Sequence, residues 1–176
     1  MHNPGGKVKT ALPPGLKGDA IFSECGQYRP LLRRWTGDKF PADFALFCGM
    51  NPSTAEAAYN DPTISREWGF ATREGLTGYV KVNVGDYRAT YPTDLLKPGI
   101  VPSSPMNLPT IAEQAYKARF VVVGYGKLNR ALAPLAASVV AVIRQAGKPV
   151  FCLGLNIDGS PKHPLYIAKD APFIPF

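Results

Sequence analysis

Four almost continuous apolar runs divide the chain and predict its buried strands. ADFALFCGM covers residues 42–50, and GYVKVNV covers residues 78–84. RFVVVGYG covers residues 119–126, and KPVFCLGL covers residues 148–155. The strands of a parallel sheet are covered on both faces, so they lose the alternation of apolar and polar positions that half-exposed strands keep. The pattern therefore predicts a sheet whose central strands are buried.

Apolar residues at helical spacing lie between these runs. Asp61 followed by Pro62 is a typical helix start, and Gly75 is a typical helix end. A second helix is expected over residues 108–117 and a third over residues 128–146. Strands and helices then alternate along the chain, which is typical of a parallel sheet with helices on both faces.

The N-terminal part follows a different pattern. Residues 1–18 are rich in Gly and Pro and are expected to form a flexible basic arm. Residues 19–24 and 28–35 predict two short strands of a hairpin at a sheet edge, where Pro30 would be tolerated. We therefore expect one α/β domain over residues 19–176. It would have three α/β/α layers around a mostly parallel four-stranded central sheet, plus the N-terminal edge hairpin.

Charge adds a candidate partner to this picture. The 176 residues carry a formal net charge of +7, and residues 1–40 alone hold seven Lys or Arg against three Asp or Glu. A basic face favours polyanions, and nucleic acid is the first candidate. Arg33 and Arg34 would contact its phosphate backbone. The alternative is a basic surface that only aids solubility.

Cysteine usage and hydropathy exclude several other classes. Cys25, Cys48 and Cys152 are widely spaced in apolar surroundings, so they predict reduced core residues of a cytoplasmic protein. A reactive role for Cys48 is the alternative, because it lies beside a motif. There is no apolar run of about 18 residues, so no membrane partner is expected. No metal-ligand spacing and no dinucleotide fingerprint occurs, so neither a metal nor a cofactor is expected, and the oligomeric state stays open.

The strand exits carry the candidate chemistry, because ligands of parallel sheets bind outside the carboxyl ends of the strands. In CGMNPSTA, Pro52 holds Asn51 extended, and Ser53 could cap a helical turn. Asn83 lies inside an apolar strand, where its amide must find partners, and an amide matches the edge of a nucleobase. The alternatives are a plain serine cap at the first exit and a structural amide at the second.

The second exit also carries Arg88, and the last exit carries His163. The guanidinium of Arg88 could bind a phosphate or a carboxylate, or form an internal ion pair with Asp86 or Asp61. His163 lies between two prolines in SPKHPLY, and its restricted position suits an electrophile or a proton donor. A structural histidine is the alternative.

Taken in order, GMNP, the strand-end Asn83 and KHPLY resemble the motifs of the uracil-DNA glycosylase superfamily. The longer set NPSTAEA, NDPTISR, VNVGDYRATYP and LGLNIDGSPKHPLY is similar to an uncharacterised bacterial and phage family, a domain of unknown function, from about residue 20 onward. The glycosylase pattern stops matching at STA and at Leu-Tyr, and DPT and YRAT have no counterpart in it. These extra polar groups suggest a different ligand in the same crevice.

The glycosylase resemblance implies roles for single residues. Asn51 would position a water or stabilise the developing sugar cation, Asn83 would read the base, and His163 would stabilise the negative charge of the departing base. Leu165 would be a wedge that fills the space of a flipped nucleotide. A stacking face would come from Tyr59, Trp68 or Phe70. The remaining expected ligand contacts are Met50, Pro52, Ser53, Asp61, Arg88 and Tyr166.

Three functions are therefore open from the sequence. The first is an enzyme that cleaves an N-glycosidic bond in DNA or in a nucleotide, in DNA repair or modification. The second is a module that binds nucleic acid or a nucleotide without cleaving it. The third is a small-molecule enzyme that uses Asp61 and Asp86 as acid and base.

Overall fold

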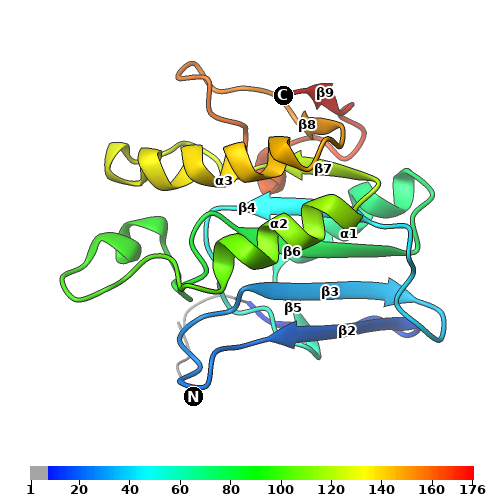
Figure 1. Cartoon of the computed structure of the whole chain (residues 1–176). Coiled ribbons are helices and arrows are strands. Elements are labelled where there is room, and N and C mark those ends of the chain that lie inside the picture. Colours follow the sequence, from blue (N-terminus) through cyan, green and yellow to red (C-terminus); the bar gives the residue numbers. More distant parts are fainter. Residues whose placement is uncertain (1–7) are drawn as a thin grey trace.

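The computed structural model describes residues 8–176, and its centre is a mixed sheet of seven strands within that range (Figure 1). The four inner strands run parallel to one another, whereas the two strands at one edge and the last strand at the other are antiparallel to their neighbours. In sheet order the strands are β2 (Leu16–Ile21), β3 (Leu31–Thr36), β6 (Gly78–Asn83), β4 (Ala45–Gly49), β7 (Phe120–Val123), β8 (Val150–Cys152) and β9 (Ile174–Pro175).

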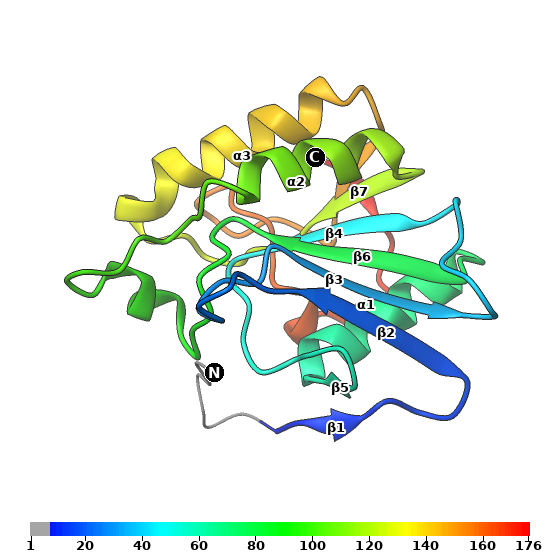
Figure 2. The same cartoon turned by 60° about the horizontal axis from the view of Figure 1, so that its bottom comes forward.

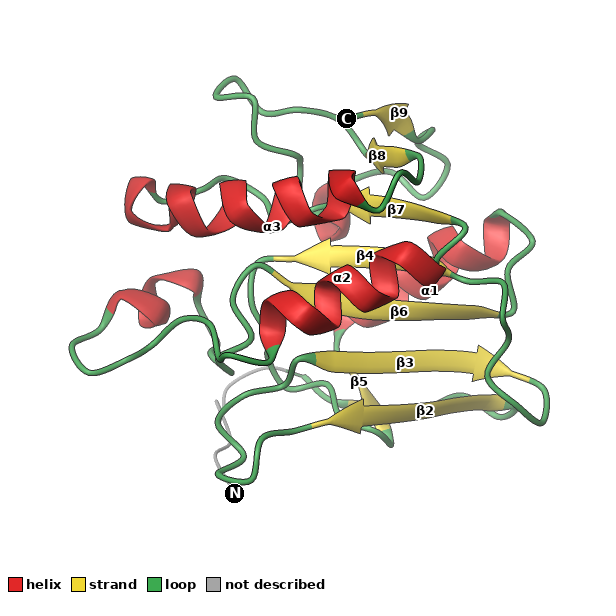
Figure 3. Ribbon diagram, viewed as in Figure 1, coloured by secondary structure: helices red, strands yellow, loops and turns green. Residues whose placement is uncertain are grey.

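Helices cover both faces of this sheet. Helix α1 (Pro62–Arg73) lies on one face, and α2 (Asn107–Lys117) and α3 (Ala133–Gln145) lie on the other (Figure 2). Figure 3 separates these helices from the long loops that leave the carboxyl ends of the strands. Short 3-10 turns occur in these loops, and two residue pairs form a small second sheet. These elements are η1 (Pro92–Leu96), η2 (Arg130–Leu132), η3 (Pro164–Tyr166), β1 (Thr10–Ala11) and β5 (Tyr59–Asn60).

The two faces of the sheet belong to two separate apolar cores. Successive residues of a strand point to opposite faces, and in β4 the side chains of Leu46 and Cys48 pack in the core of α2 and α3. Ala45 and Phe47 pack in the core of α1. All five residues of β4 are buried, which explains why this strand reads as a continuous apolar run.

The predicted helix boundaries hold at α1 and move at α3. Asp61 caps α1 by accepting the Ile64 N–H at 2.9 Å, and Pro62 begins the helix as expected. The third helix was expected from residue 128, but α3 begins at Ala133. Pro134 has no N–H to donate, so it is tolerated only in the first turn of a helix.

The expected α/β class is confirmed. The sheet differs from the expected mostly parallel four-stranded sheet, because it is mixed and has seven strands among the described residues. The parallel strands β6, β4, β7 and β8 are present, but three antiparallel strands extend them into a mixed sheet. The hairpin lies at a sheet edge as expected, yet β2 begins at Leu16, which is buried. Thr10 and Ala11 pair with β5. Strands therefore reach into the segment that was expected to be an arm, and residues 1–7 of that expected arm lie outside the described residues.

The two arginines expected to contact a nucleic-acid backbone do not lie free on the surface. Arg34 is 0% exposed, and its guanidinium donates to Asn60 Oδ1 at 2.7 Å and to the carbonyl oxygens of Glu56 and Tyr59 at 2.6 and 2.8 Å. The prediction for Arg34 is therefore wrong, because its side chain fastens the β5 segment to the sheet. Arg33 is neutralised by Asp19, with an Nη2 to Oδ2 distance of 2.6 Å.

We expect Arg34→Met to lower the free energy of unfolding by about 3 kcal/mol, because the buried Asn60 amide oxygen and two part-buried carbonyl oxygens lose their donor. Arg33→Met is the matched control on the same strand. It removes a part-exposed ion pair and should cost less than about 1 kcal/mol. Urea unfolding followed by circular dichroism measures both. Equal losses in the two variants would contradict the structural role of Arg34.

Candidate functional site

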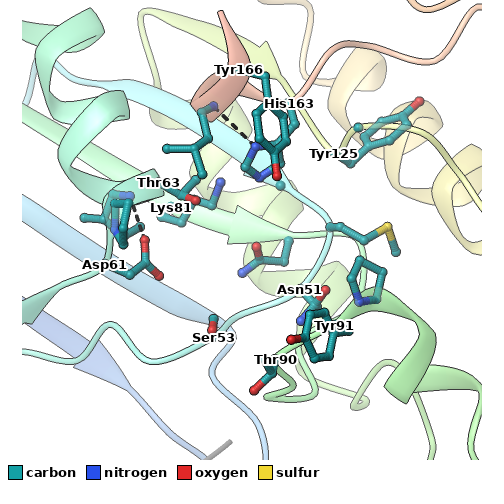
Figure 4. A pocket seen from close by; sticks show the side chains of 18 of the residues that line it. Asn51, Ser53, Asp61, Thr63, Lys81, Thr90, Tyr91, Tyr125, His163 and Tyr166 are labelled. Carbon is teal, nitrogen blue, oxygen red and sulfur yellow. Dashed lines mark hydrogen bonds between the residues drawn. The ribbon is translucent and has the colours of Figure 1, made fainter. Parts of the chain in front are cut away.

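A cavity of about 560 Å3 lies at the carboxyl ends of β4, β6 and β7, on the face of the sheet that α1 covers. Asp61 and Thr63 from the start of α1 form one side, and Asn51 and Tyr91 form the opposite side (Figure 4). His163 closes the cavity from the loop after β8. Segments far apart in the sequence thus meet where the strand-exit rule places a ligand.

The first strand exit is held by its own asparagine. Asn51 Nδ2 donates to the carbonyl oxygens of Ala89 at 2.7 Å and Pro52 at 3.3 Å. The Ala89 N–H in turn donates to the Pro52 carbonyl at 2.9 Å. The amide nitrogen of Asn51 therefore fixes the loop at this exit. Pro52 stiffens this exit but does not line the cavity.

Asn83 ends β6 at the base of the cavity. Its side chain is 1% exposed, and neither Oδ1 nor Nδ2 has a hydrogen-bond partner among the described residues. Leaving such groups unpaired costs roughly 1–3 kcal/mol each, so a buried amide without partners is rare in native proteins. This amide lines the cavity and presents one donor and one acceptor there.

Lys81 lies two residues before Asn83 on the same face of β6, and the sequence analysis missed it. Lys81 also lines the cavity, and its Nζ is 2.5 Å from Glu67 Oε1 on α1. The side chains of Lys81 and Glu67 are 5% and 1% exposed. Burial raises the pKa of Glu67, and the Lys81 ammonium opposes that shift. A lysine inside the otherwise apolar run GYVKVNV was the sequence signal for this pair.

Two more polar groups line the cavity near the start of α1. Arg29 is 1% exposed and donates to the Ala55 carbonyl. Burial lowers the pKa of Arg29 to about 10, so its guanidinium is still protonated at neutral pH. The hydroxyl of Ser53 is buried without a partner among the described residues. Ser53 was expected here, whereas Arg29 was not.

His163 is fixed in position by a hydrogen bond and by two glycines. The Leu165 N–H donates to His163 Nδ1 at 3.3 Å, so the neutral ring carries its proton on Nε2. A β-carbon on Gly126 would lie 3.3 Å from His163 Cβ, and one on Gly124 would lie 2.9 Å from Pro164. The run VGYG therefore lets the His163 loop pack closely on the exit of β7.

Aromatic side chains line the cavity, but they differ from those expected. Phe70 is buried in the core under α1, and Tyr59 lies in β5 away from the cavity. Tyr91 and Tyr125 line it instead, together with Tyr166, which was expected as a ligand contact. These tyrosines come from loops, where apolar periodicity gives no signal. Trp68, the third candidate for stacking, packs on Tyr79 with ring centroids 6.2 Å apart.

The other expected contacts divide between the cavity and the interior. Met50 and Leu165 line the cavity as expected. Arg88 does not, because its side chain is 0% exposed and its Nη2 pairs with Glu56 Oε1 at 3.1 Å. Asp86 accepts hydrogen bonds from the N–H and the hydroxyl of Ser104, outside the cavity. Asp61 and Asp86 therefore do not form an acid and base pair in one site.

The comparison with protein families now bears on this geometry. The model of a family described as a protein of unknown function (DUF1643) matches residues 29–165, most of the chain. The chain belongs to this family. Among the described residues that line the cavity, all but Val8 and Tyr166 lie in the matched segment. The expected domain of unknown function is confirmed in this coarse form. No curated protein and no solved structure matches the chain.

The remaining sequence predictions concern cysteines, metals and membranes. Cys48 and Cys152 are buried as expected, but Cys25 is exposed in the loop between β2 and β3. Burial raises the pKa of Cys48 to about 12, which argues against a reactive thiolate. Residues 8–176 contain no cluster of three His, Cys, Asp or Glu placed to hold a metal ion, and none of their helices is long and apolar enough to cross a membrane.

We expect Lys81→Met to destabilise the fold by about 3 kcal/mol at pH 7, because Glu67 is left as an unpaired buried carboxylate. The raised pKa of Glu67 sets the sign of the pH dependence. The folded state binds this proton more tightly than the unfolded state, so stability should fall as the pH rises above about 4.5. Urea unfolding between pH 5 and pH 8 measures the slope.

Lys81→Met combined with Glu67→Leu is the control for this prediction. It replaces the ion pair with an apolar pair, so it should recover most of the lost stability and the pH slope should disappear. A loss in Lys81→Met that does not change with pH would rule out Glu67 as its cause.

Proposed function

We propose that the cavity binds a nucleobase, presented by a nucleotide or by nucleic acid. The observation that carries this proposal is the amide of Asn83, which is 1% exposed and has no partner for its donor or its acceptor among the described residues. The edge of a nucleobase carries donors and acceptors side by side in one plane. A base in the cavity would satisfy both groups of Asn83 at once and offset the cost of burying them.

The lining of the cavity suits a flat aromatic ligand. Tyr91 and Tyr166 are 63% and 83% exposed and contribute to the lining, so their rings are accessible for stacking on a base. The volume of about 560 Å3 lies within the range of small-molecule sites, which is about 300–1,000 Å3.

The charges around the cavity favour an anionic group attached to the base. Arg29, Lys81 and Lys127 line the cavity against the carboxylates of Asp61 in its lining and Glu67 behind Lys81, so one positive charge is in excess. An excess of cations raises the local concentration of anions such as phosphate. A nucleotide or a phosphodiester strand therefore fits better than a free base.

Cleavage of the N-glycosidic bond is the reaction we propose for this site. The motifs GMNP and KHPLY, which resemble those of glycosylases, supply Asn51 and His163 to the same cavity. The C1′–N bond would break, the base would leave with the bonding electrons, and water would add to C1′ and release a proton that ends on the base. His163 Nε2–H would donate to the departing base, and Asn51 Oδ1 would accept a hydrogen bond from the water.

A module that binds without cleaving is the second candidate, and two observations favour it. Asn51 uses its amide nitrogen to hold the Ala89 loop. Asp61 already accepts the Ile64 N–H as the cap of α1. Neither group is wholly available to activate water, whereas Asn83 is wholly available to bind a base.

We expect Asn83→Leu to abolish nucleotide binding while the fold becomes about 1 kcal/mol more stable, because two unpaired polar groups leave the interior. Asn107→Leu is the matched control. Asn107 is also fully buried, but its Nδ2 donates to the carbonyl oxygens of Asn83 and Val84. That variant should lose about 2 kcal/mol of stability. Calorimetric titration with mononucleotides and urea unfolding give the two readouts, and a destabilised Asn83→Leu would mean that Asn83 is structural.

We expect His163→Asn to retain base binding within a few-fold and to slow base release by about 100-fold or more. The Asn side chain can still accept the Leu165 N–H as a cap, but it lacks the second ring nitrogen. The assay measures free base released from single- and double-stranded DNA with modified bases and from nucleotides, with Asn51→Ala beside it. Nucleotide binding with no release from any substrate would support the binding module.

A further inference from the structure

A small niche at the base of the cavity is defined by Gly49. A β-carbon added to Gly49 would lie 2.5 Å from Lys81 Nζ and 3.0 Å from Asn83 Oδ1. The cation and the amide therefore converge on one point above the glycine, although they do not hydrogen-bond to each other. Gly49 is the last residue of β4 and pairs with Asn83 across the sheet. Any larger residue would fill this space.

The cation in this niche is costly to maintain without a function. Lys81 and Glu67 are both more than nine-tenths buried, and the second carboxylate oxygen of Glu67 has no partner among the described residues. Taking both charges out of water costs more than their attraction returns unless further hydrogen bonds form, so a buried pair is weak evidence for a stabilising role. An apolar pair would fill the same space at lower cost.

The orientation of Lys81 indicates what the pair does. Its ammonium has three N–H donors, and its one partner among the described residues is Glu67, at 2.5 Å. Lys81 lines the cavity, whereas Glu67 does not. Glu67 is thus placed behind the lysine, where it holds the ammonium at the niche and neutralises it within the core.

We propose that Lys81 Nζ donates a charge-assisted hydrogen bond to an oxygen of the ligand, next to the group that Asn83 reads. This inference rests on the proposed nucleobase site. It adds that the site selects ligands with an oxygen acceptor at this position. The inner edge of the ligand carries an oxygen acceptor, which is the keto oxygen of a base or an anionic oxygen. An exocyclic amino group would face the ammonium with N–H bonds of its own and leave it unpaired. Lys81 is thus a specificity-determining residue, and Glu67 is a positioning residue.

Two pairs of nucleotides test this proposal with the full chain. Inosine and adenosine monophosphates differ in a keto or an amino group on the same ring, and so do uridine and cytidine monophosphates. We expect the keto member of at least one pair to bind about tenfold more tightly, since hydrogen bonds to charged groups are the strong ones. In the double variant Lys81→Met with Glu67→Leu, that preference should fall to about unity.

A second double variant controls for loss of an ion pair as such. Arg33→Met with Asp19→Leu removes a pair from the same sheet outside the cavity, and it should keep the wild-type preference. If the Lys81 and Glu67 double variant also keeps the preference while nucleotides still bind, the role of Lys81 is overturned and the proposed function stands. If the wild type binds both members of each pair with equal affinity, the role of Lys81 is likewise overturned and the proposed function stands.

Failure of the proposed function gives a different result. If no nucleotide binds, nitrogen-15 spectra of the lysine ammonium groups are recorded with acetate, inorganic phosphate and a cyclic amide as probes. A shift of the Lys81 signal by any of these probes would show that the niche takes an oxygen ligand other than a nucleobase, which supports the role of Lys81. Without a shift from any probe, the niche takes no oxygen ligand and the inference fails.

Discussion

The ion pair between Lys81 and Glu67 connects the two elements on which the rest of the site depends. Lys81 belongs to a central strand of the sheet, and Glu67 belongs to the helix that covers one face of that sheet. Asp61 caps the same helix and Thr63 lies in its first turn, and both form a side of the cavity. Because the pair is buried, α1 cannot shift along the sheet without separating two charges in a medium of low polarity. The width of the cavity is therefore fixed by an interaction at its base.

Close backbone packing fixes the other side. Gly124 and Gly126 leave room for the loop of Pro164 and His163 to pack against the exit of β7, and the Gly126 N–H donates to the Pro161 carbonyl at 3.0 Å. The histidine then receives the Leu165 N–H on Nδ1. The backbone of Leu165 thus holds the ring, and the backbone of Gly126 holds the loop that carries it. One side of the cavity is therefore positioned by the buried ion pair. The other side is positioned by close packing against Gly124 and Gly126.

Local signals in the sequence predicted the framework well, because burial and capping are properties of short segments. The apolar runs predicted the four parallel strands, and Asp61 predicted the start of α1. The strand-exit rule brought Asn83 and His163 into one cavity. Charge counts failed for Arg34, because the number of basic residues does not tell which of them are buried. Lys81 could not be interpreted without its partner, since Lys81 and Glu67 lie fourteen positions apart in the chain and become neighbours only when α1 docks on the sheet.

Under the proposed function, the unpaired amide of Asn83 also links the stability of the fold to the supply of ligand. Buried donors and acceptors without partners lower the free energy of unfolding, and a ligand that bonds to them removes this cost. The ligand would bind the folded state and raise the free energy of unfolding by mass action. At a ligand concentration of a hundred times Kd, the increase is about 2.7 kcal/mol. Without ligand, a larger fraction of the protein would be unfolded, and proteases and chaperones act on that fraction. The lifetime of the protein would therefore increase with the concentration of its ligand.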